Sequence, residues 1–255
     1  MKIVDVNAYH GQWPYWPLRN NNPESLLRRM DRYEIGLAFI CSLKAVFADV
    51  EAGNAETLRL VQRHPQRFAP VFTYSPYAPG KERFHDDVQE SGACIIKLFP
   101  LHHSYDPLEE PYICELLDFC AEASIPVMLP HRLMASWRFP AFDIQKMGAL
   151  VLRHPQTRFI LSSINYLFEL QSALDVMRRA PNVYLETSGM MAFREIAYVV
   201  QQIGADRLLH GSANPLQNPA IGPLKILSAE ISEQEKERIL FGNAAQLLFF
   251  NKNKD

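Results

Sequence analysis

Short, uninterrupted apolar runs alternate along the chain with longer segments in which apolar residues recur at helical spacing. Runs without polar interruption are typical of parallel strands that are covered on both faces. Between them lie polar loops rich in proline, asparagine and glycine, which are common turn residues. The expected strands are 3–6, 36–41, 69–73, 93–98, 126–129, 158–162, 182–186 and 206–210.

Helix boundaries are marked by capping residues and prolines. Asn22-Pro23-Glu24 places a cap, a proline at the first helical position and an acid in the first turn, which predicts a helix start. Pro65 predicts the end of a helix before it. The expected helices are 22–33, 55–63, 81–90, 111–123, 143–152, 168–179, 193–203 and 233–249.

Alternation of strands and helices predicts an α/β fold with a parallel sheet, and eight such units can close into a (β/α)₈ TIM barrel with extra helices at the C-terminus. The 255 residues suit one domain, 1–255, with its core at about 3–249. An open doubly wound sheet is the alternative, but no G-x-G-x-x-G motif follows the first strand. The look-alike turns 63–68 and 153–159 each join a helix to a strand, which predicts a structural role at the bottom of the barrel.

Composition excludes several classes of function. The formal net charge of -2 gives no electrostatic basis for binding nucleic acid or an anionic membrane. No apolar run approaches the ~20 residues needed to span a bilayer, and no signal peptide is expected before the first strand. Four cysteines without a C-x-x-C pair predict reduced, buried thiols. We therefore expect a cytoplasmic protein, and a homo-oligomer stays open.

Five histidines lie at or just after the ends of expected strands: His10, His102, His103, His131 and His210. In a barrel, these strand ends share one rim. A metal site needs at least three converging ligands, and Glu186 is the one carboxylate that directly ends a strand among these segments. Lys97 also ends an apolar strand. It either extends to water or supplies a cation to the barrel mouth.

Several short motifs follow one another in a fixed order. They are Asp5-Val6-Asn7-Ala8-Tyr9, Ile96-Lys97-Leu98-Phe99-Pro100, Ile125-Pro126-Val127-Met128-Leu129-Pro130, Phe159-Ile160-Leu161-Ser162-Ser163, Asn182-Val183-Tyr184-Leu185-Glu186-Thr187-Ser188, Asp206-Arg207-Leu208-Leu209-His210-Gly211-Ser212-Ala213-Asn214-Pro215 and Gly242-Asn243-Ala244-Ala245. From Ile3 to about Leu248 the chain resembles the amidohydrolase superfamily, in particular its amidohydrolase-related branch. The resemblance implies a TIM barrel and metal-dependent hydrolase or decarboxylase chemistry through an activated water.

The chain departs from this family pattern at the positions that the resemblance assigns to the metal. The residues found there are Asn7 and Tyr9 in the first strand, Pro130 in the fifth, Ser163 after the sixth and Ala213 after the eighth. His131 lies one residue beyond its family position. Five departures together predict that the metal-water mechanism is lost and that no metal cofactor is held. One zinc or another divalent metal on relocated ligands is the alternative.

Three functional hypotheses follow. The barrel is a non-catalytic homologue, an enzyme with metal-free acid–base chemistry, or an active metal-dependent hydrolase or decarboxylase with relocated ligands. A mouth filled by Trp13, Trp16 and Trp137 would favour the first hypothesis. A closed pocket surrounded by the polar candidates would favour the second.

A small carboxylate or other anion is the expected ligand, because cations at the mouth have no aspartate at Ala213 to balance them. Lys97 and His131 would hold the anion, with Arg132 and His210 on the same rim. The competing expectation is that Arg132 points to solvent and Lys97 pairs with Glu186. Candidate catalytic residues are Lys97, His131 and Tyr9. Candidate ligand-binding residues are Asn7, Tyr9, His10, Lys97, His102, His131, Ser163, His210 and Asn214.

Overall fold

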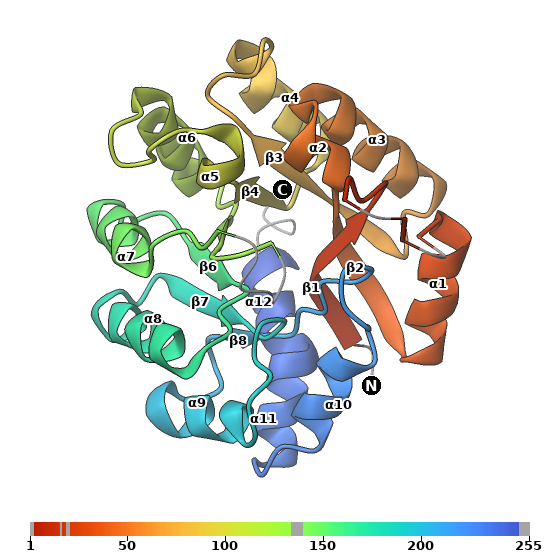
Figure 1. Ribbon diagram of the computed structural model, residues 1–255, viewed down its shortest axis with the longest axis vertical. Helices are drawn as coiled ribbons and strands as arrows, with labels where there is room; N and C mark the ends of the chain where they lie inside the picture. The colour runs from red at the N-terminus through yellow and green to blue at the C-terminus, as the bar shows by residue number, and fades with distance from the viewer. Residues whose placement is uncertain (1–2, 16, 19–20, 134–139, 250–255) are drawn as a thin grey trace.

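Eight parallel strands form the centre of the molecule in a computed structural model, which describes residues 3–15, 17–18, 21–133 and 140–249. Each strand pairs with the next along the chain, in the order β1 to β8, and helices surround them (Figure 1). The strands are β1 (Ile3–His10), β2 (Ile35–Ser42), β3 (Phe68–Tyr74), β4 (Ile95–Leu98), β5 (Val127–Pro130), β6 (Phe159–Ser162), β7 (Val183–Glu186) and β8 (Leu208–Leu209).

Backbone hydrogen bonds between β1 and the chain after β8 bring the two edges of the sheet together. The Val6 amide donates to the His210 carbonyl over 2.9 Å, and the Tyr9 amide donates to the Asn214 carbonyl over 2.7 Å. In the reverse direction, the Ala213 amide donates to the Asn7 carbonyl over 2.7 Å. The predicted TIM barrel is therefore confirmed.

Helices cover the outside of the barrel, and several begin at capping residues visible in the sequence. The Asn22 side chain accepts from the Ser25 amide at the start of α1, as the Asn-Pro-Glu pattern predicts. The helices are α1 (Pro23–Arg32), α2 (Leu43–Phe47), α3 (Val50–Arg63), η1 (Lys81–Arg83), α4 (Phe84–Ser91), α5 (Pro100–His103), α6 (Pro111–Glu122), α7 (Ile144–Arg153), α8 (Leu167–Arg179), α9 (Glu195–Ile203), α10 (Ile221–Leu227), α11 (Glu233–Glu237), η2 (Arg238–Gly242) and α12 (Asn243–Phe249).

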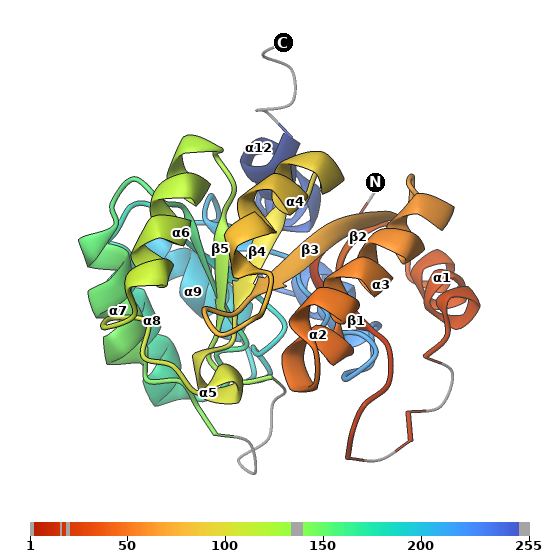
Figure 2. The same ribbon diagram turned by 90° about the horizontal axis from the view of Figure 1, so that it is seen from above.

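The two ends of the barrel are closed differently. In Figure 2, α12 lies at one end and α5 at the opposite end. Ala244 and Leu247 of α12 pack with Val4, Val71 and Ile160 inside the barrel, so the C-terminal helix fills the end where the strands begin. At the end where the strands finish, loops and polar side chains occupy the barrel instead. His64 and His154 follow α3 and α7 directly, which confirms the predicted bottom-face turns.

Some predicted boundaries were wrong. The helix expected at 55–63 begins at Val50, because the Asp49 side chain accepts from the Ala52 amide and caps it there. The region expected as helix 81–90 begins with a 3₁₀ turn, and the helix expected at 233–249 is interrupted by the π-helical turn η2. The short helices α2, α5 and α10 were not predicted. Judged by length and apolar content, none of the described helices could span a bilayer.

Candidate functional site: a buried polar cluster at the barrel centre

Side chains from β1, β4 and β7 meet inside the barrel near the ends of these strands. Asn7, Lys97 and Glu186 are each 0% exposed, and their side chains form a continuous hydrogen-bonded cluster with serines at or just after the ends of β6 and β7. A buried lysine and a buried glutamate are uncommon unless they have partners. We call these three residues, together with Tyr9, Ser162, Ser163 and Ser188, the central cluster.

Lys97 lies between an amide oxygen and an aromatic ring. Its Nζ donates to Asn7 Oδ1 over 2.7 Å and lies 4.0 Å from the centre of the Tyr9 ring. A cation over a ring that is shielded from water gains about 2 kcal/mol. Burial lowers the pKa of Lys97, and the nearby Cys41, Glu186 and Asp5 groups oppose that shift.

The Glu186 carboxylate accepts hydrogen bonds from the two strand-end loops beside it. Its Oε1 accepts from Ser162 Oγ over 2.8 Å, from the Ser163 amide over 2.7 Å and from Ser188 Oγ over 2.6 Å. Its Oε2 accepts from the Ser188 amide over 2.7 Å. Short hydrogen bonds to an ionised carboxylate are the strong kind, so they stabilise the charge in this buried position.

Asn7 joins the cation to the carboxylate. While its Oδ1 accepts from Lys97, its Nδ2 lies 3.2 Å from Glu186 Oε1, 3.2 Å from Ser162 Oγ and 3.3 Å from Ser188 Oγ. The partners determine the orientation of the amide, because an ammonium group needs an acceptor and a carboxylate needs a donor. Lys97 and Glu186 are thus linked through Asn7.

The backbone around Glu186 is shaped to admit this carboxylate. A Cβ atom at Gly211 would lie 2.0 Å from Glu186 Oε2, so a glycine is required for the close approach. Ser163 has a φ of 57°, in the left-handed region that non-glycine residues seldom adopt. This conformation directs the Ser163 amide at Glu186, and the charged hydrogen bond offsets the backbone strain.

Asp5 and His210 are two further buried polar residues, outside the central cluster. Asp5 Oδ1 accepts from the Ser212 amide over 3.0 Å and from the Asn7 amide over 3.1 Å. His210 Nδ1 lies 2.9 Å from the Val4 carbonyl, so Nδ1 carries a proton and Nε2 is the free acceptor of the neutral ring. Burial lowers the pKa of His210 and favours this neutral form. A Cβ atom at Gly222 would lie 2.6 Å from Nε2.

His131 and Arg132 form a separate group around a carboxylate of α8. Arg132 donates through both terminal nitrogens to Glu169, each over 2.6 Å, and His131 Nε2 lies 3.2 Å from the same carboxylate. His131 Nδ1 donates to the Phe142 carbonyl over 2.6 Å. Burial alone would raise the pKa of Glu169, but Arg132 and its other partners outweigh burial and lower it to about 2.

This geometry corrects two expectations about the rim. Arg132 was expected either to balance an anion in the mouth or to point to solvent, but it is paired with Glu169. Lys97 was expected to pair with Glu186 if it held no anion, but Asn7 mediates that link. Among the described residues, no hydrogen bond or ion pair is found between His131 and Lys97. Glu169 supplies the countercharge that we had not anticipated, because the first turn of α8 lies beside the end of β5.

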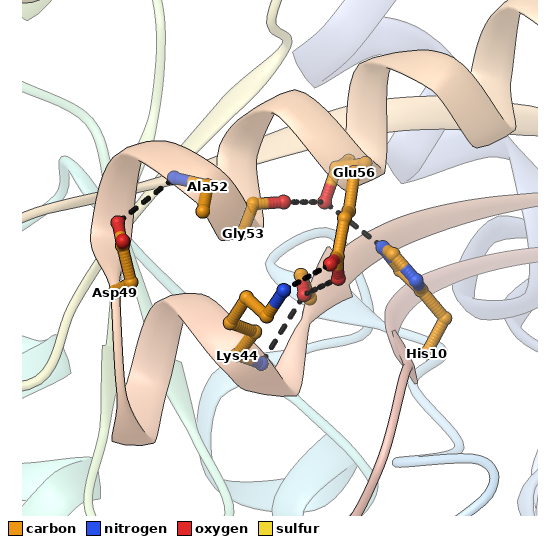
Figure 3. A network of polar contacts seen from close by, with 8 residues as sticks. His10, Lys44, Asp49, Ala52, Gly53 and Glu56 are labelled. Carbon is orange, nitrogen blue, oxygen red and sulfur yellow. Dashed lines mark hydrogen bonds and ion pairs between the residues drawn. The ribbon is translucent and has the colours of Figure 1, made fainter.

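His10 belongs to a third group, between β1 and α3 (Figure 3). Its Nε2 lies 2.9 Å from Thr57 Oγ1, and that hydroxyl donates to the Gly53 carbonyl over 3.2 Å. Since the hydroxyl has one proton, His10 Nε2 is the donor. Burial lowers the pKa of His10 to about 4, although Glu56 opposes the shift. Lys44 and Ser42 bind Glu56 in the same network, apart from the central cluster.

The remaining predicted site residues are also dispersed. His102 packs edge-on against Phe47 and Phe99, and burial lowers its pKa to about 4. His103 Nε2 lies 3.2 Å from the carbonyls of Ala45 and Val46. The five candidate histidines therefore do not converge on one point. His10, His131 and His210 have different partners, whereas His102 and His103 both pack against Phe99. Within the described residues, no three His, Cys, Asp or Glu side chains are arranged to hold a metal ion.

Three polar atoms near the ends of β1 and β8 have no hydrogen-bond partner among the described residues. They are the Tyr9 hydroxyl, Asn214 Oδ1 and His210 Nε2. Buried polar groups in native proteins are nearly always satisfied by protein, water or a ligand, so such atoms call for an explanation. Trp13, one of the three tryptophans whose position in the mouth would favour a non-catalytic barrel, is buried. Trp16 and Trp137 lie outside the described residues.

Ser162, Ser188, Asp5 and Glu169 were not among the site residues predicted from the sequence. A local signal existed for the first two, because polar residues that end parallel strands share one end of the barrel. Glu186 carried the same signal and was noted for it. No comparable signal marks Glu169, which belongs to a helix.

Comparison with known proteins places this architecture in a family. The sequence profile of the amidohydrolase family matches residues 5–250. No curated protein sequence matches significantly. An uncharacterized TIM-barrel protein from Bordetella bronchiseptica has 20% identity, with 97% of this chain and 98% of that chain covered and a TM-score of 0.73.

Two decarboxylases have the same fold at lower identity. A 2,6-dihydroxybenzoate decarboxylase has 17% identity, with 97% of this chain and 98% of that chain covered and a TM-score of 0.72. The 5-carboxyvanillate decarboxylase of Sphingomonas paucimobilis has 14% identity, the same two coverages and a TM-score of 0.73. The fold and the match to the family profile over nearly the whole chain lead to one conclusion: this protein belongs to the amidohydrolase family.

Proposed function

We propose that the centre of the barrel binds a small carboxylate, with Lys97 as the cation that holds it, and that it does so without a divalent metal. The position of Lys97 carries the proposal. Its ammonium group has three N–H donors and is fully buried. Asn7 Oδ1 and the Tyr9 ring account for two of these directions. The third donor has no hydrogen-bond acceptor among the described residues, and a carboxylate oxygen would satisfy it.

Tyr9 provides a second donor beside Lys97. Its hydroxyl is buried and lacks a partner in the described part of the chain, which costs about 1–3 kcal/mol if the group stays unsatisfied. Burial raises the pKa of Tyr9 well above its ordinary value, so the hydroxyl keeps its proton and can donate it. An anion that accepts from both groups would remove this cost and would also relieve the unfavourable burial of the Lys97 charge.

The donor set supports binding without a metal. At the two β1 positions that the family resemblance assigns to the metal, this chain has an amide and a phenol, and the amide oxygen of Asn7 already faces Lys97 at 2.7 Å. A divalent cation at that oxygen would lie against the ammonium group and be repelled by it. The oxygens of Glu186 are occupied by serine and amide donors. These residues do not fit a divalent metal.

The class of ligand has independent support from similar structures. The two decarboxylases named above carry carboxylate compounds in their names, 2,6-dihydroxybenzoate and 5-carboxyvanillate. We infer that the same ligand class suits this barrel, with an ammonium group and a phenol as the groups that recognise it. Catalysis by relocated metal ligands is the alternative.

Calorimetric titration with benzoate, 2,6-dihydroxybenzoate and inorganic phosphate tests the proposal. We expect at least one carboxylate to bind the wild type and Lys97→Met to lose at least about thirtyfold in affinity, the effect of losing a charged hydrogen bond. Lys44→Met, which removes an exposed ion pair with Glu56, is the matched control and should bind as the wild type does. Absence of binding to the wild type, or equal binding by Lys97→Met, would overturn the proposal.

Lys97→Met leaves Glu186 without its linked cation and could therefore fail to fold. A second variant keeps the proposal testable in that case. Tyr9→Phe removes one hydroxyl that makes no hydrogen bond within the described residues, so its fold should be unaffected. We expect Tyr9→Phe to weaken carboxylate binding by about five- to tenfold. Unchanged affinity in a folded Tyr9→Phe protein would remove Tyr9 from the proposed site.

A further inference from the structure

Lys225 of α10 binds the backbone of the loop between β7 and α9. Its Nζ donates to the Met190 carbonyl over 2.8 Å and also to the Thr187 carbonyl, and the Ser188 carbonyl lies 3.5 Å away. Lysines of outer helices usually extend their ammonium group into water. The convergence of three carbonyls on Lys225 instead indicates that its charge has a role in this loop.

The three carbonyls belong to a single turn, residues 187–190, which we call the β7 turn. The Met190 amide donates to the Thr187 carbonyl over 3.1 Å, as in a four-residue β-turn. Lys225 therefore binds the first and the last carbonyl of the turn. On its other side, a Cβ atom at Gly189 would lie 2.2 Å from the Ile164 carbonyl oxygen, so the turn lies directly against the loop after β6.

Ser188, the second residue of the β7 turn, connects the turn to the central cluster. Its amide donates to Glu186 Oε2 over 2.7 Å and its hydroxyl donates to Glu186 Oε1 over 2.6 Å. The same hydroxyl lies 3.3 Å from Asn7 Nδ2, and the oxygen of that amide accepts from Lys97. A displacement of the turn would therefore move both donors of Ser188 and disturb the groups that orient Asn7.

The position of α10 allows Lys225 to reach the turn. A Cβ atom at Gly222 would lie 2.6 Å from His210 Nε2 and 3.5 Å from the Gly211 carbonyl oxygen, so α10 contacts the chain that follows β8. Gly222 and Lys225 are three residues apart and share one face of the helix. Because this face touches the end of β8, the Lys225 side chain can extend from it to the neighbouring loop after β7.

We propose that Lys225 is a positioning residue for the carboxylate site: its charged ammonium group fixes the β7 turn so that Ser188 keeps the central cluster in its binding arrangement. The charge matters because an ammonium group has three N–H donors for these carbonyls. A neutral amine has only two donors, and its lone pair would face a carbonyl oxygen. The effect on a ligand rests on the proposed function, whereas the contact with the turn belongs to the free protein.

The hold on the β7 turn should weaken in mildly alkaline solution. Burial lowers the pKa of Lys225 to about 8, although Glu186 of β7 and Glu195 of α9 oppose the shift. His210, beside α10, also senses the Lys225 charge, and its own lowered pKa keeps it neutral above pH 6.5. Lys225 therefore carries most of its charge below about pH 8 and loses it as the pH rises further.

Amide NMR of the ligand-free chain tests the hold on the turn. We expect the Ser188 amide to exchange with solvent at least about tenfold faster in Lys225→Met than in the wild type at pH 7. The Val127 amide, which donates to the Arg158 carbonyl, should exchange equally in both proteins. Lys146→Met removes an exposed ion pair with Asp106 and is the matched control variant.

A wild-type measurement decides the inference even where Lys225→Met does not fold. The amide signals of the β7 turn should shift with a midpoint near pH 8 in the wild type. Absence of this transition, or equal Ser188 exchange in wild type and folded Lys225→Met, would overturn the inference.

Calorimetry with benzoate and 2,6-dihydroxybenzoate at pH 7 and pH 9 tests the effect on the site. We expect Lys225→Met to bind about tenfold more weakly than the wild type at pH 7 and less than about threefold more weakly at pH 9. Titration of Lys97 affects both proteins and cancels in this ratio. A ratio that is equal at the two pH values would mean a structural role that is independent of the charge, and would overturn the inference.

Failure of the proposed function has a different signature. A wild type that binds no carboxylate would overturn the proposed function and the effect of Lys225 on a ligand. The exchange and pH data on the ligand-free chain would still decide whether Lys225 holds the β7 turn.

Discussion

Lys97 Nζ donates to Asn7 Oδ1 over 2.7 Å, in the interior of a barrel where neither side chain reaches solvent. The other end of the same amide faces Glu186. One neutral side chain thus connects a buried cation to a buried carboxylate, and each charge has a hydrogen-bonding partner. Because these groups share partners, we expect them to behave as a unit when one is changed.

Asn7→Ala should destabilise the protein by about 2–4 kcal/mol, because it leaves Lys97 without its acceptor and removes a donor from Glu186. Urea denaturation measures the change. Asn182→Ala is the control: Asn182 Nδ2 donates to the neutral carbonyls of His154 and Thr157, so its loss should cost about 1 kcal/mol. Equal losses for the two variants would contradict a charge-linking role for Asn7.

Gly211→Ala should disturb the central cluster directly. The added methyl group would lie 2.0 Å from Glu186 Oε2, and the carboxylate is held by several hydrogen bonds and cannot easily move. We expect a loss of about 2–3 kcal/mol in thermal unfolding. At Gly242 a methyl group would meet no atom closer than 3.8 Å, so Gly242→Ala should be nearly neutral. A fully stable Gly211→Ala protein would show that Glu186 is less confined than described.

His10 should make the stability of the folded protein depend on pH. In the folded chain its pKa is lowered by burial to about 4, whereas the ordinary value is 6.5. Between these two values the unfolded chain binds a proton that the folded chain does not, so stability falls as pH drops from about 6.5 to about 4, by up to roughly 3 kcal/mol. His10→Gln should lose less stability over this window. Chemical denaturation at several pH values gives the free energy of unfolding. If this free energy depended on pH as strongly in His10→Gln as in the wild type, His10 would be excluded as the cause.

Arg132 should stabilise the protein through Glu169. The pKa of Glu169 is about 2 in the folded chain against an ordinary 4.5, so its contribution is complete above about pH 4.5 and is lost as pH falls toward 2. Arg132→Met should cost about 1–3 kcal/mol at neutral pH and less at low pH. Arg178→Met removes an exposed pair with Asp175 and should change stability by less than about 0.5 kcal/mol. A pH-independent effect of Arg132→Met would contradict this assignment.

The fold was predictable because its strands are buried on both faces and appear as apolar runs in the sequence. The strands Ile95–Leu98 and Phe159–Ser162 could be identified from the sequence without knowing which strands they pair with. The short helices were not predictable in this way. Pro100–His103 has one turn, and Ile221–Leu227 contains Gly222 and Pro223, which usually signal a break. Their helical form depends on tertiary contacts.

The site was partly predictable from strand geometry. Alternate residues of a strand face opposite sides, which accounts for Asn7 and Tyr9 in the central cluster and for His10 against Thr57 of α3. His10 was predicted to be a mouth residue from its place at the end of the strand, but the alternation along the strand directs it to the outside, against α3. The pairing of His131 with Glu169 could not be foreseen, since it depends on where α8 begins in space.

The central claim is that the barrel binds a small carboxylate without a divalent metal. Its most direct test uses protein dialysed against a chelator and the carboxylate that binds the wild type most tightly. Calorimetry measures the affinity before and after stoichiometric zinc or manganese is added. Elemental analysis of the same sample establishes its metal content. Our account predicts one-to-one binding by metal-depleted protein and no change in affinity when metal returns. Binding that appears only after metal is added would contradict it and would favour relocated metal ligands.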